Sequence, residues 1–316
     1  MKLSVLVPAY NLEKYIEECL VSLCEQATDF DFEVVVCDDA SPDNTADVIR
    51  SLAFKYPVIR PIFKKQNGGL AANMKTLLAG AEGDYIAYVD GDDVALPGKL
   101  QKQVDYLDAH DDCAMVYHES DMFDSYTGET IKQYSQGHYN WAQIPKQSNI
   151  THLIRYGTYM QASAVMFKRH KHLVDTVLDE CKIILDYPFY IMNAGFLNAR
   201  IDFIPAVLSR YRIHEDSFGG QTQKSVGRRL QSLNDIITAC KSASRFEIDK
   251  QAIDAGIAHH QFAAALYFLF RANNEQFKSL IETSAKGKLF FNHRHKLAWQ
   301  HSGNPEKLRK MLAIHP

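Results

Sequence analysis

The chain carries three carboxylates within four residues, at Asp90, Asp92 and Asp93. Carboxylates this close repel one another unless a cation or hydrogen-bond donors offset their charge. Together they can place oxygen atoms around Mg2+ or Mn2+, while a substrate diphosphate supplies the remaining ligands. An ordinary solvated turn is the alternative interpretation, since aspartate and glycine are common in turns. The position of the group directly after an apolar run, residues 85–89, favours the metal site.

A second acidic group, Asp38 and Asp39, follows the apolar run at residues 33–37. The carboxylate of Asp39 can accept a hydrogen bond from the imide N–H of a nucleobase. A few residues later, Asp43 or Ser41 is typical of the position before a helix, where a side chain caps free backbone N–H groups. The segment therefore predicts both a nucleotide contact and a helix start.

The third polar group is Pro8-Ala9-Tyr10, directly after the apolar residues 3–7. The Tyr10 ring offers an edge or a face to a nucleobase, and the backbone of Pro8 and Ala9 can line its rim. A buried tyrosine at the end of a strand is the alternative interpretation. The occurrence of three such polar groups after apolar runs favours a shared ligand site.

These groups need elements that bring them together. Short β-branched runs alternate with amphipathic helical patterns, which is typical of a doubly wound α/β fold with a mainly parallel sheet and helices on both faces. Ligands of such folds bind at the carboxyl ends of the strands, where all three groups fall. The patterns predict strands at residues 3–7, 33–37, 59–63 and 85–89, and helices at 15–23, 46–53, 69–81 and 97–107.

The second half of the chain contains fewer clear elements. Strands are predicted at 114–118, 162–167 and 206–211, with a mobile polar surface loop at 124–146. From about residue 225 the strand patterns give way to a sequence rich in alanine, leucine, lysine and glutamine. The predicted organisation is a domain at 1–218, with a nucleotide-binding half (1–110) and an acceptor-side half (111–218), followed by a helical C-terminal extension (219–316).

The composition limits the function classes. Hydrophobic residues make up 46% and charged residues 23% of the 316 residues, as in a globular protein with a sizeable core. A net charge of −3 provides no general attraction to nucleic acid, so none is expected as a partner. The six cysteines have no zinc-ligand spacing, which favours buried reduced thiols. No signal-peptide or membrane-spanning pattern is recognised, and a cytoplasmic protein is expected.

Four segments together carry a family resemblance. They resemble the family 2 glycosyltransferases with the GT-A fold, an inverting family that includes many polysaccharide-building enzymes. The resemblance is close over residues 1–110 and loose over 111–218. The segments are Val5-Leu-Val-Pro-Ala-Tyr-Asn11, Val36-Cys-Asp-Asp-Ala-Ser-Pro-Asp-Asn-Thr45, Asn67-Gly-Gly69 and Tyr88-Val-Asp-Gly-Asp-Asp93.

The resemblance implies roles for individual residues. Pro8, Tyr10 and Asp39 hold the nucleobase, usually uracil. Asp90 lies near the ribose, and the metal residues are Asp92 with Asp93 as its support. Where many relatives have Ala-Arg-Asn, this chain reads Ala71-Ala-Asn-Met-Lys75, with Lys75 as the candidate substitute for the arginine. The residues predicted to bind the donor are Pro8, Ala9, Tyr10, Asp39, Asn67, Gly68, Asn73, Asp90, Gly91 and His214.

The resemblance also points to a catalytic base, Asp186, at the acidic position that precedes an acceptor-side helix. In Ile184-Leu-Asp-Tyr-Pro-Phe189 the alternative is a helix cap, because proline suits a first helical turn. His214 lies in Tyr211-Arg-Ile-His214, which resembles a late Tyr-Arg-x-His segment of the family. It could touch the diphosphate or the metal, or be an ordinary loop histidine. Gln161 and His118 are placed on the acceptor side.

The leading hypothesis is an inverting glycosyltransferase that moves a sugar from a nucleoside diphosphate sugar, expected to be UDP-linked, to a hydroxyl of a glycan or lipid-linked acceptor. It would serve glycan or polysaccharide biosynthesis with Mn2+ or Mg2+ as cofactor. A nucleotidyltransferase that makes a nucleotide sugar is one alternative, but it favours a glycine-rich phosphate loop where this chain has Pro8-Ala-Tyr-Asn11. A non-catalytic sugar-nucleotide-binding protein is the other.

The basic and aromatic residues 286–299 suggest a peripheral contact of the C-terminal helices with the inner face of the membrane. An amphipathic helix packed on the catalytic domain is the alternative interpretation.

Overall fold

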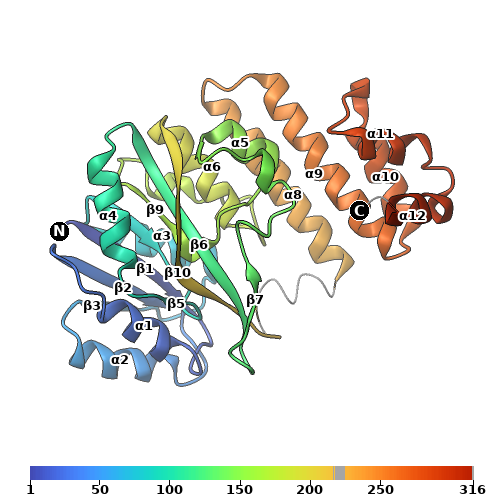
Figure 1. The fold of residues 1–316 in the computed structure, drawn as a ribbon. Helices are drawn as coiled ribbons and strands as arrows, with labels where there is room; N and C mark the ends of the chain where they lie inside the picture. Colours follow the sequence, from blue (N-terminus) through green and yellow to red (C-terminus); the bar gives the residue numbers. More distant parts are fainter. Residues whose placement is uncertain (216, 218–224, 315–316) are drawn as a thin grey trace.

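The computed structural model describes residues 1–215, 217 and 225–314. One mixed sheet forms the centre of the molecule, in the order β3-β2-β1-β4-β9-β6-β10-β5, with β7 paired to β6 and β8 to β10 (Figure 1). Its strands are β1 (Leu3–Ala9), β2 (Phe32–Asp38), β3 (Ile59–Phe63), β4 (Tyr85–Tyr88), β5 (Val94–Ala95), β6 (Cys113–Asp124), β7 (Thr130–Gln133), β8 (Gln147–Ser148), β9 (Val165–Lys168) and β10 (Arg200–Ile213).

The strands β1 to β4 form a parallel unit in which β2 and β4 flank β1 and β3 pairs with β2. Strand β9 then runs antiparallel to both β4 and β6, whereas β6 and β10 are parallel. The predicted doubly wound α/β fold is confirmed, with a second half in which parallel and antiparallel pairs mix.

Helices cover both faces of this sheet. Val5 and Val7 of β1 point into one hydrophobic core, and Leu6 points into the other, because side chains alternate along a strand. A strand buried on both faces needs a nearly continuous apolar run, which is the pattern seen in the sequence. One core is closed by α1 (Ile16–Cys24), α2 (Thr45–Lys55) and α4 (Lys99–Ala109), and the other by α3 (Gly69–Gly80), α5 (Ile150–Tyr156) and α6 (Asp186–Leu197).

Within residues 124–146, predicted as a mobile surface loop, Thr130–Gln133 form strand β7, which pairs with β6. The residues that follow β7 are fixed by the carboxylate of Glu119, which accepts hydrogen bonds from the backbone N–H groups of Ser135 and Gln136 at 2.9 Å each. Ser135 is buried. The polar composition of the segment gave no sign of this, since the partner that satisfies its backbone lies on β6.

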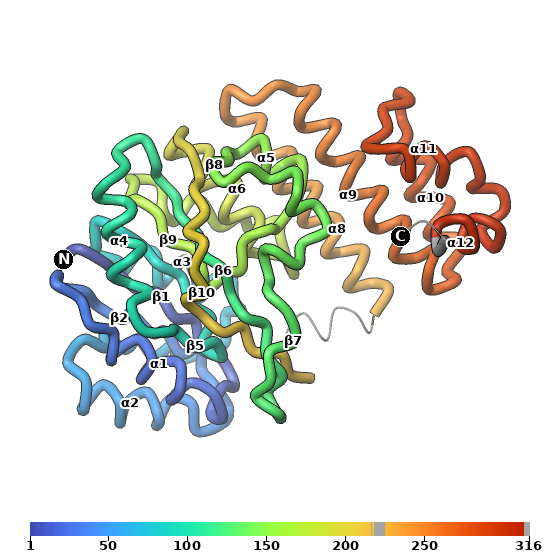
Figure 2. Tube along the Cα trace, viewed as in Figure 1, coloured from blue at the N-terminus to red at the C-terminus, as the bar shows by residue number. Residues whose placement is uncertain are grey.

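The residues from 225 to 314 consist of helices and their connections. Helices α8 and α9 lie between the sheet and the more distal α10, α11 and α12 (Figures 1 and 2). The predicted boundary between residues 218 and 219 falls outside the described residues. The helices are α8 (Val226–Ser242), α9 (Lys250–Phe270), α10 (Asn274–Ser284), α11 (His293–Gln300) and α12 (Pro305–Ile314).

The C-terminal extension is anchored on the second half of the main domain. Cys240 of α8 and Ile253 of α9 belong to the same core as α5 and α6. The Tyr187 hydroxyl of α6 lies 3.3 Å from His260 Nε2 of α9. The distal helices have a separate core around Phe277. The extension is therefore fixed against the half of the domain that contains Asp186.

The basic and aromatic segment 286–299 packs largely within the extension. The Phe291 ring stacks on His259 at 3.7 Å between centroids, and Phe290 packs against Trp299 at 5.6 Å. These two contacts lie within the extension. The alternative, an amphipathic helix packed on the catalytic domain, is met only at Phe291, whose ring centroid lies 4.6 Å from the guanidinium carbon of Arg155 on α5. Membrane contact stays a prediction. Among the described residues, no helix combines the length and the hydropathy needed to cross a membrane.

Candidate active site

A cavity of about 400 Å3 opens at the carboxyl end of β4, between the sheet and α6. It brings together three of the predicted site residues, Asp90, Asp92 and Asp186, from segments far apart in the chain. The other lining residues, mostly apolar or aromatic, are Leu70, Met74, Tyr88, Tyr134, Gln161, Ala162, Ile183, Ile184, Leu185, Phe189, Tyr190, Tyr211, Ser217 and Arg229.

The acidic turn lies directly against the end of β1, and Gly91 makes this possible. A Cβ atom on Gly91 would lie 2.9 Å from the carbonyl oxygen of Pro8 and 2.8 Å from Cδ1 of Leu12. A backbone oxygen cannot give way as a flexible side chain can, so the close approach needs glycine. The turn is closed by the Asp93 N–H, which donates to the Asp90 carbonyl at 3.0 Å.

Asp93 is fully buried behind the turn. Its carboxylate accepts hydrogen bonds from Gln161 Nε2 at 2.7 Å, Ser163 Oγ at 2.6 Å and the Arg212 N–H at 2.9 Å. Burial, and then the charge of Asp92, raises the pKa of Asp93 well above its usual value, while the donors act in the opposite direction. With both oxygens occupied, Asp93 has the contacts of a residue that supports the turn. Its role as a direct metal ligand stays a prediction.

Asp92 faces the cavity beside His214, with 3.0 Å between Asp92 Oδ2 and His214 Nε2. The imidazole packs on the ring of Tyr15, 4.8 Å away, at the start of α1. Arg212 lies on the same ring, donates to the Asp92 carbonyl at 2.8 Å and pairs with Glu18 at 2.5 Å. Tyr15 and Glu18 were missed by the sequence analysis, because Tyr15 fitted the inner stripe of a helix.

Asp92 and His214 are the two predicted site residues that lie in direct contact beside the cavity. A carboxylate suits Mg2+ and Mn2+, whereas an imidazole suits a transition metal such as Mn2+ better than Mg2+. A divalent cation held by this pair stays a prediction. Within the described ranges no third histidine, cysteine or carboxylate completes a ligand group. The remaining ligands would therefore be oxygens of a bound diphosphate and water, which is how Mg2+ is commonly held in nucleotide sites.

Asp90 lies at the mouth of β4 and lines the cavity. Burial, reinforced by the charges of Asp92 and Asp186, raises its pKa to about 7. A carboxyl group near this value can either accept or donate a hydrogen bond at neutral pH. Both options suit a ribose hydroxyl, which is itself a donor and an acceptor.

At the end of β2, Asp39 already has several partners. Its carboxylate accepts hydrogen bonds from the N–H groups of Gly68 at 3.1 Å and Gly69 at 2.7 Å, and it lies 2.6 Å from Lys64 Nζ. The φ of +80° at Gly69 favours glycine, and Asn67 Oδ1 accepts from the same N–H at 3.0 Å. Asp39 thus organises the Asn67-Gly-Gly69 segment, and its contact with a base stays a prediction.

Two other acceptors at the end of β2 remain open. Within the described part of the chain, Asp38 Oδ1 and Asn73 Oδ1 are buried oxygens without a hydrogen-bond partner. The Asn73 amide donates to the Cys37 carbonyl at 2.9 Å, which fixes its orientation. Nearby, Tyr10 is 47% exposed, whereas Pro8 and Ala9 are buried in β1. The strand ends therefore present an exposed ring and the two buried oxygens without partners, and a contact of these groups with a base stays a prediction.

Lys75, the candidate substitute for the missing arginine, points to another partner. Its ammonium group lies 2.6 Å from Asp179 Oδ1 on the segment before α6. This pair ties α3 to that segment.

Asp186 is the first residue of α6, and Pro188 lies in the first turn as predicted. The carboxylate accepts a hydrogen bond from the Tyr187 N–H at 2.8 Å and faces the cavity. Burial raises the pKa of Asp186 above its usual value. The alternative interpretation of Asp186 as a helix cap is wrong, because Leu185 occupies the cap position and no side chain caps this helix. The role of Asp186 as catalytic base stays a prediction.

Most of the aromatic wall of the cavity had no signal in the sequence; of its three tyrosines named below, only Tyr211 lay in a segment that the sequence singled out. Tyr134 follows β7, Tyr190 lies on α6 and Tyr211 on β10, and they meet around Asp186 only through the fold. Arg229 comes from the C-terminal extension, which was not assigned to the site. Periodic patterns identify such residues as core or surface, and cannot show that they share a cavity.

The two residues placed on the acceptor side have different outcomes. Gln161 lines the cavity, with its amide committed to Asp93. The placement of His118 is wrong, because the residue is fully buried in β6 and its Nδ1 lies 2.8 Å from the Glu119 carbonyl. The alternation of β6 turns this side chain away from the cavity.

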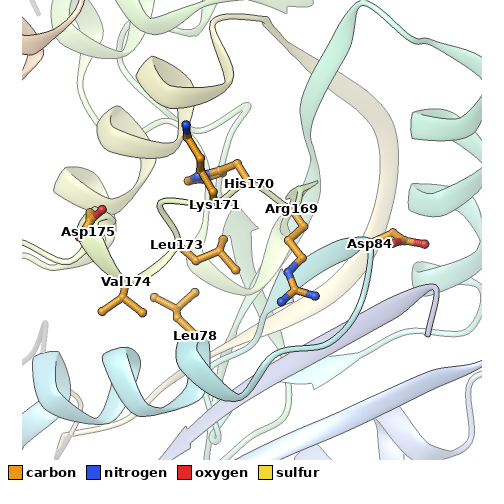
Figure 3. Close-up of a pocket in the computed structure, with 8 residues that line it drawn as sticks. All are labelled: Leu78, Asp84, Arg169, His170, Lys171, Leu173, Val174 and Asp175. Atoms are coloured by element: carbon orange, nitrogen blue, oxygen red, sulfur yellow. The ribbon is translucent and has the colours of Figure 1, made fainter.

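A second cavity, of about 540 Å3, lies at the other end of the strands from the acidic turn. Figure 3 shows Arg169, His170 and Lys171 on the segment that leaves β9, with Leu78 beside Leu173. The pairing of Lys168 with Tyr85 places this segment at the amino end of β4. None of the predicted site residues lines it, so the acidic cavity is the candidate active site.

Comparison with protein families identifies the main domain. The model of the glycosyl transferase family 2 matches residues 4–172, more than half of the chain. The chain belongs to this family. The family assignment agrees with the resemblance carried by the four segments of the sequence.

Relatives within family 2 match only part of their own length. An uncharacterised protein of Mycobacterium tuberculosis is 42% identical over 118 residues, which cover 37% of this chain and 34% of that protein. The putative glycosyltransferase EpsE of Bacillus subtilis is 40% identical over 110 residues (34% and 39%). Chondroitin synthase of Pasteurella multocida is 30% identical over 188 residues (60% and 18%). The matched region thus spans about a third of the first relative.

Solved structures share the fold over nearly the whole chain. TarS 1-349 of S. aureus has a TM-score of 0.64 at 20% identity, covering 98% of this chain and 87% of that one. It has also been solved in complex with UDP and with UDP-GlcNAc. The mannosyltransferase PcManGT from Pyrobaculum calidifontis, in complex with GDP-Man and Mn2+, has a TM-score of 0.59 at 17% identity, covering 100% and 88%. At these identities the similarity establishes the fold.

Proposed function

We propose that this family 2 member is an inverting glycosyltransferase that moves a sugar from a nucleoside diphosphate sugar to a hydroxyl of a glycan or lipid-linked acceptor. The observation that carries the proposal is the shared cavity of Asp90, Asp92 and Asp186. In this cavity Asp90 and Asp92 would meet the nucleotide and the cation, and the carboxylate of Asp186 would accept a proton. The relatives' names support a role in polysaccharide biosynthesis.

The donor would lie along the carboxyl ends of β1, β2 and β4. The base would meet Tyr10 and the open acceptors Asp38 Oδ1 and Asn73 Oδ1. The ribose would meet Asp90, and the diphosphate would lie at Asp92 beside His214. UDP is the proposed nucleotide, in line with the uracil preference of the family and the UDP complex of TarS.

Asp92 and His214 would hold a divalent cation, with Asp93 and Gly91 keeping the turn in place. When bound, the cation supplies electrostatic stabilisation of the negative charge on the leaving diphosphate. The protein residues around it position the carboxylate and the imidazole: Tyr15 packs on the ring of His214.

Asp186 would act as the general base. An acceptor hydroxyl attacks the anomeric carbon from the face opposite the nucleotide, so a new C–O bond forms as the bond to the diphosphate oxygen breaks. The hydroxyl proton passes to Asp186 as the hydroxyl becomes acidic, and the nucleoside diphosphate leaves. The raised pKa of Asp186 favours this transfer, since a base works best when its pKa lies near the operating pH. The surrounding tyrosine rings limit access of water.

The test combines binding and turnover. UDP, GDP, TDP and CMP are compared for thermal stabilisation with and without Mn2+, since a ligand at a hundred times its Kd adds about 2.7 kcal/mol. A Mn2+-dependent shift with UDP, lost in Asp92→Ala, is expected. Asp186→Asn should keep this shift and lower UDP release with oligosaccharide acceptors by about 100-fold or more. Full turnover in Asp186→Asn would overturn the assignment of the base, and no shift with any nucleotide would overturn the donor site.

A further inference from the structure

One cation lines the candidate active site, and it comes from the C-terminal extension. Arg229 lies near the start of α8 and borders the cavity that contains Asp186. Among residues 1–215, 217 and 225–314, no carboxylate forms an ion pair with Arg229. A partly buried guanidinium without a carboxylate partner is costly unless another anion meets it.

The fold holds Arg229 in place by an aromatic contact. Its guanidinium carbon lies 4.5 Å from the ring centroid of Tyr267 on α9, and that of Arg271 lies 3.8 Å from the same centroid. Burial lowers the pKa of Arg229, and the charge of Arg271 acts in the same direction. Arginine remains protonated in proteins, so Arg229 brings a fixed positive charge to the cavity lining, while the exposed Arg271 packs on the same Tyr267 ring outside that lining.

The lining of the cavity carries both charges, the acidic turn after β4 and Arg229 of α8. Helix α8 also holds the segment that leads to Asp186, because Asp235 Oδ2 accepts hydrogen bonds from the N–H groups of Ile183 at 2.6 Å and Ile184 at 2.9 Å. If the diphosphate lies at Asp92, Arg229 therefore comes from the helix that packs behind Asp186, on the side where the acceptor would bind.

We propose that Arg229, held against the ring of Tyr267, binds an anionic group of the acceptor, a phosphate or a carboxylate carried near the reacting hydroxyl. Arginine suits both groups, because its planar fork donates two parallel hydrogen bonds to either. This inference rests on the proposed function, and it gives the C-terminal extension a part in acceptor selection. A purely structural arginine would affect folding without any preference for charged acceptors.

The test measures binding of matched probes to the full chain by isothermal titration, with and without UDP and Mn2+. One pair is a uronate-containing tetrasaccharide and its methyl ester. The other pair is a phosphorylated oligosaccharide and its phosphatase-treated form. At least one charged probe should bind about tenfold or more tightly than its neutral partner, and the pair that does so identifies the anion.

Arg229→Gln should abolish this preference and leave UDP affinity unchanged. Arg245→Gln is the matched control, since it removes the same charge from an exposed site elsewhere in the extension and should change neither. Arg229→Lys keeps the charge without the fork, so an intermediate preference is expected, and it serves as the second variant if Arg229→Gln fails to fold.

Three results would overturn the proposal: no charge preference in either pair, a preference that persists in Arg229→Gln, or a loss of UDP affinity in Arg229→Gln, which would place the arginine on the donor instead of the acceptor. Failure of the proposed function has a different outcome. In that case the wild-type chain does not bind UDP or release it from a donor, whatever its preference among the charged probes.

Discussion

Lys99 offers a prediction whose size follows directly from the structure. This residue lies in the first turn of α4 and is fully buried. Its Nζ donates to Gln103 Oε1 at 2.7 Å. Burial lowers the pKa of Lys99 to about 7, from the ordinary 10.5.

The consequence is a pH-dependent loss of stability. Between pH 7 and 10.5 the unfolded chain binds more protons at this position than the folded chain, so the free energy of unfolding rises with pH across this window. The burial of Lys99 costs the folded state about 4 kcal/mol at pH 7 and about 2 kcal/mol at pH 9, and nothing above pH ~10.5. His118 stays neutral throughout this range, because burial and then the charge of Lys99 keep its pKa well below the usual value.

Lys99→Met keeps the apolar stem and removes the ammonium group. The variant leaves Gln103 Oε1 without this donor, which costs about 1–3 kcal/mol. The net expectation at pH 7 is a stabilisation of about 1–3 kcal/mol. Lys102→Met is the matched control, since Lys102 lies on the same helix with its side chain exposed.

The assay is urea denaturation at pH 7, 8 and 9, with the difference between variant and wild type as the readout. This difference cancels the titration of other groups, such as cysteines and tyrosines. The advantage of Lys99→Met should fall by about 2 kcal/mol from pH 7 to pH 9. A difference that does not change with pH, or a variant that is less stable than the wild type at pH 7, would refute the reasoning.

Three further substitutions test the site. Gly91→Ala should push the acidic turn off the Pro8 carbonyl and weaken UDP binding about tenfold or more, and unchanged affinity by titration would contradict this. Asp39→Asn should lower the free energy of unfolding by about 1–3 kcal/mol in urea denaturation, because the Gly68 and Gly69 N–H groups lose one carboxylate oxygen as acceptor. A variant as stable as the wild type would contradict the role of Asp39 in organising this loop. Tyr15→Leu removes the ring that packs on His214, so it should weaken UDP binding only when Mn2+ is present. An equal loss of UDP affinity without Mn2+ would indicate general damage to the fold.

The sequence by itself was enough to predict the first half of the fold and the family. Val5 to Val7 and Val34 to Cys37 are apolar at every position because both faces of these strands are covered, and that requirement is local. The acidic turn could be placed at a strand end for the same reason. The four segments could be recognised because they follow these strands in a fixed order.

The tertiary structure alone decided how the predicted residues divide the work. Asp92 and Asp93 are neighbours in the chain, yet one faces a cavity and the other accepts bonds from Gln161, Ser163 and Arg212. Arg229 enters the site only because α8 packs on α6. Periodicity records which side of an element is apolar, but the partner of a buried polar group is chosen by long-range packing. For that reason the residue types of the site could be predicted from the sequence, and their geometry could not.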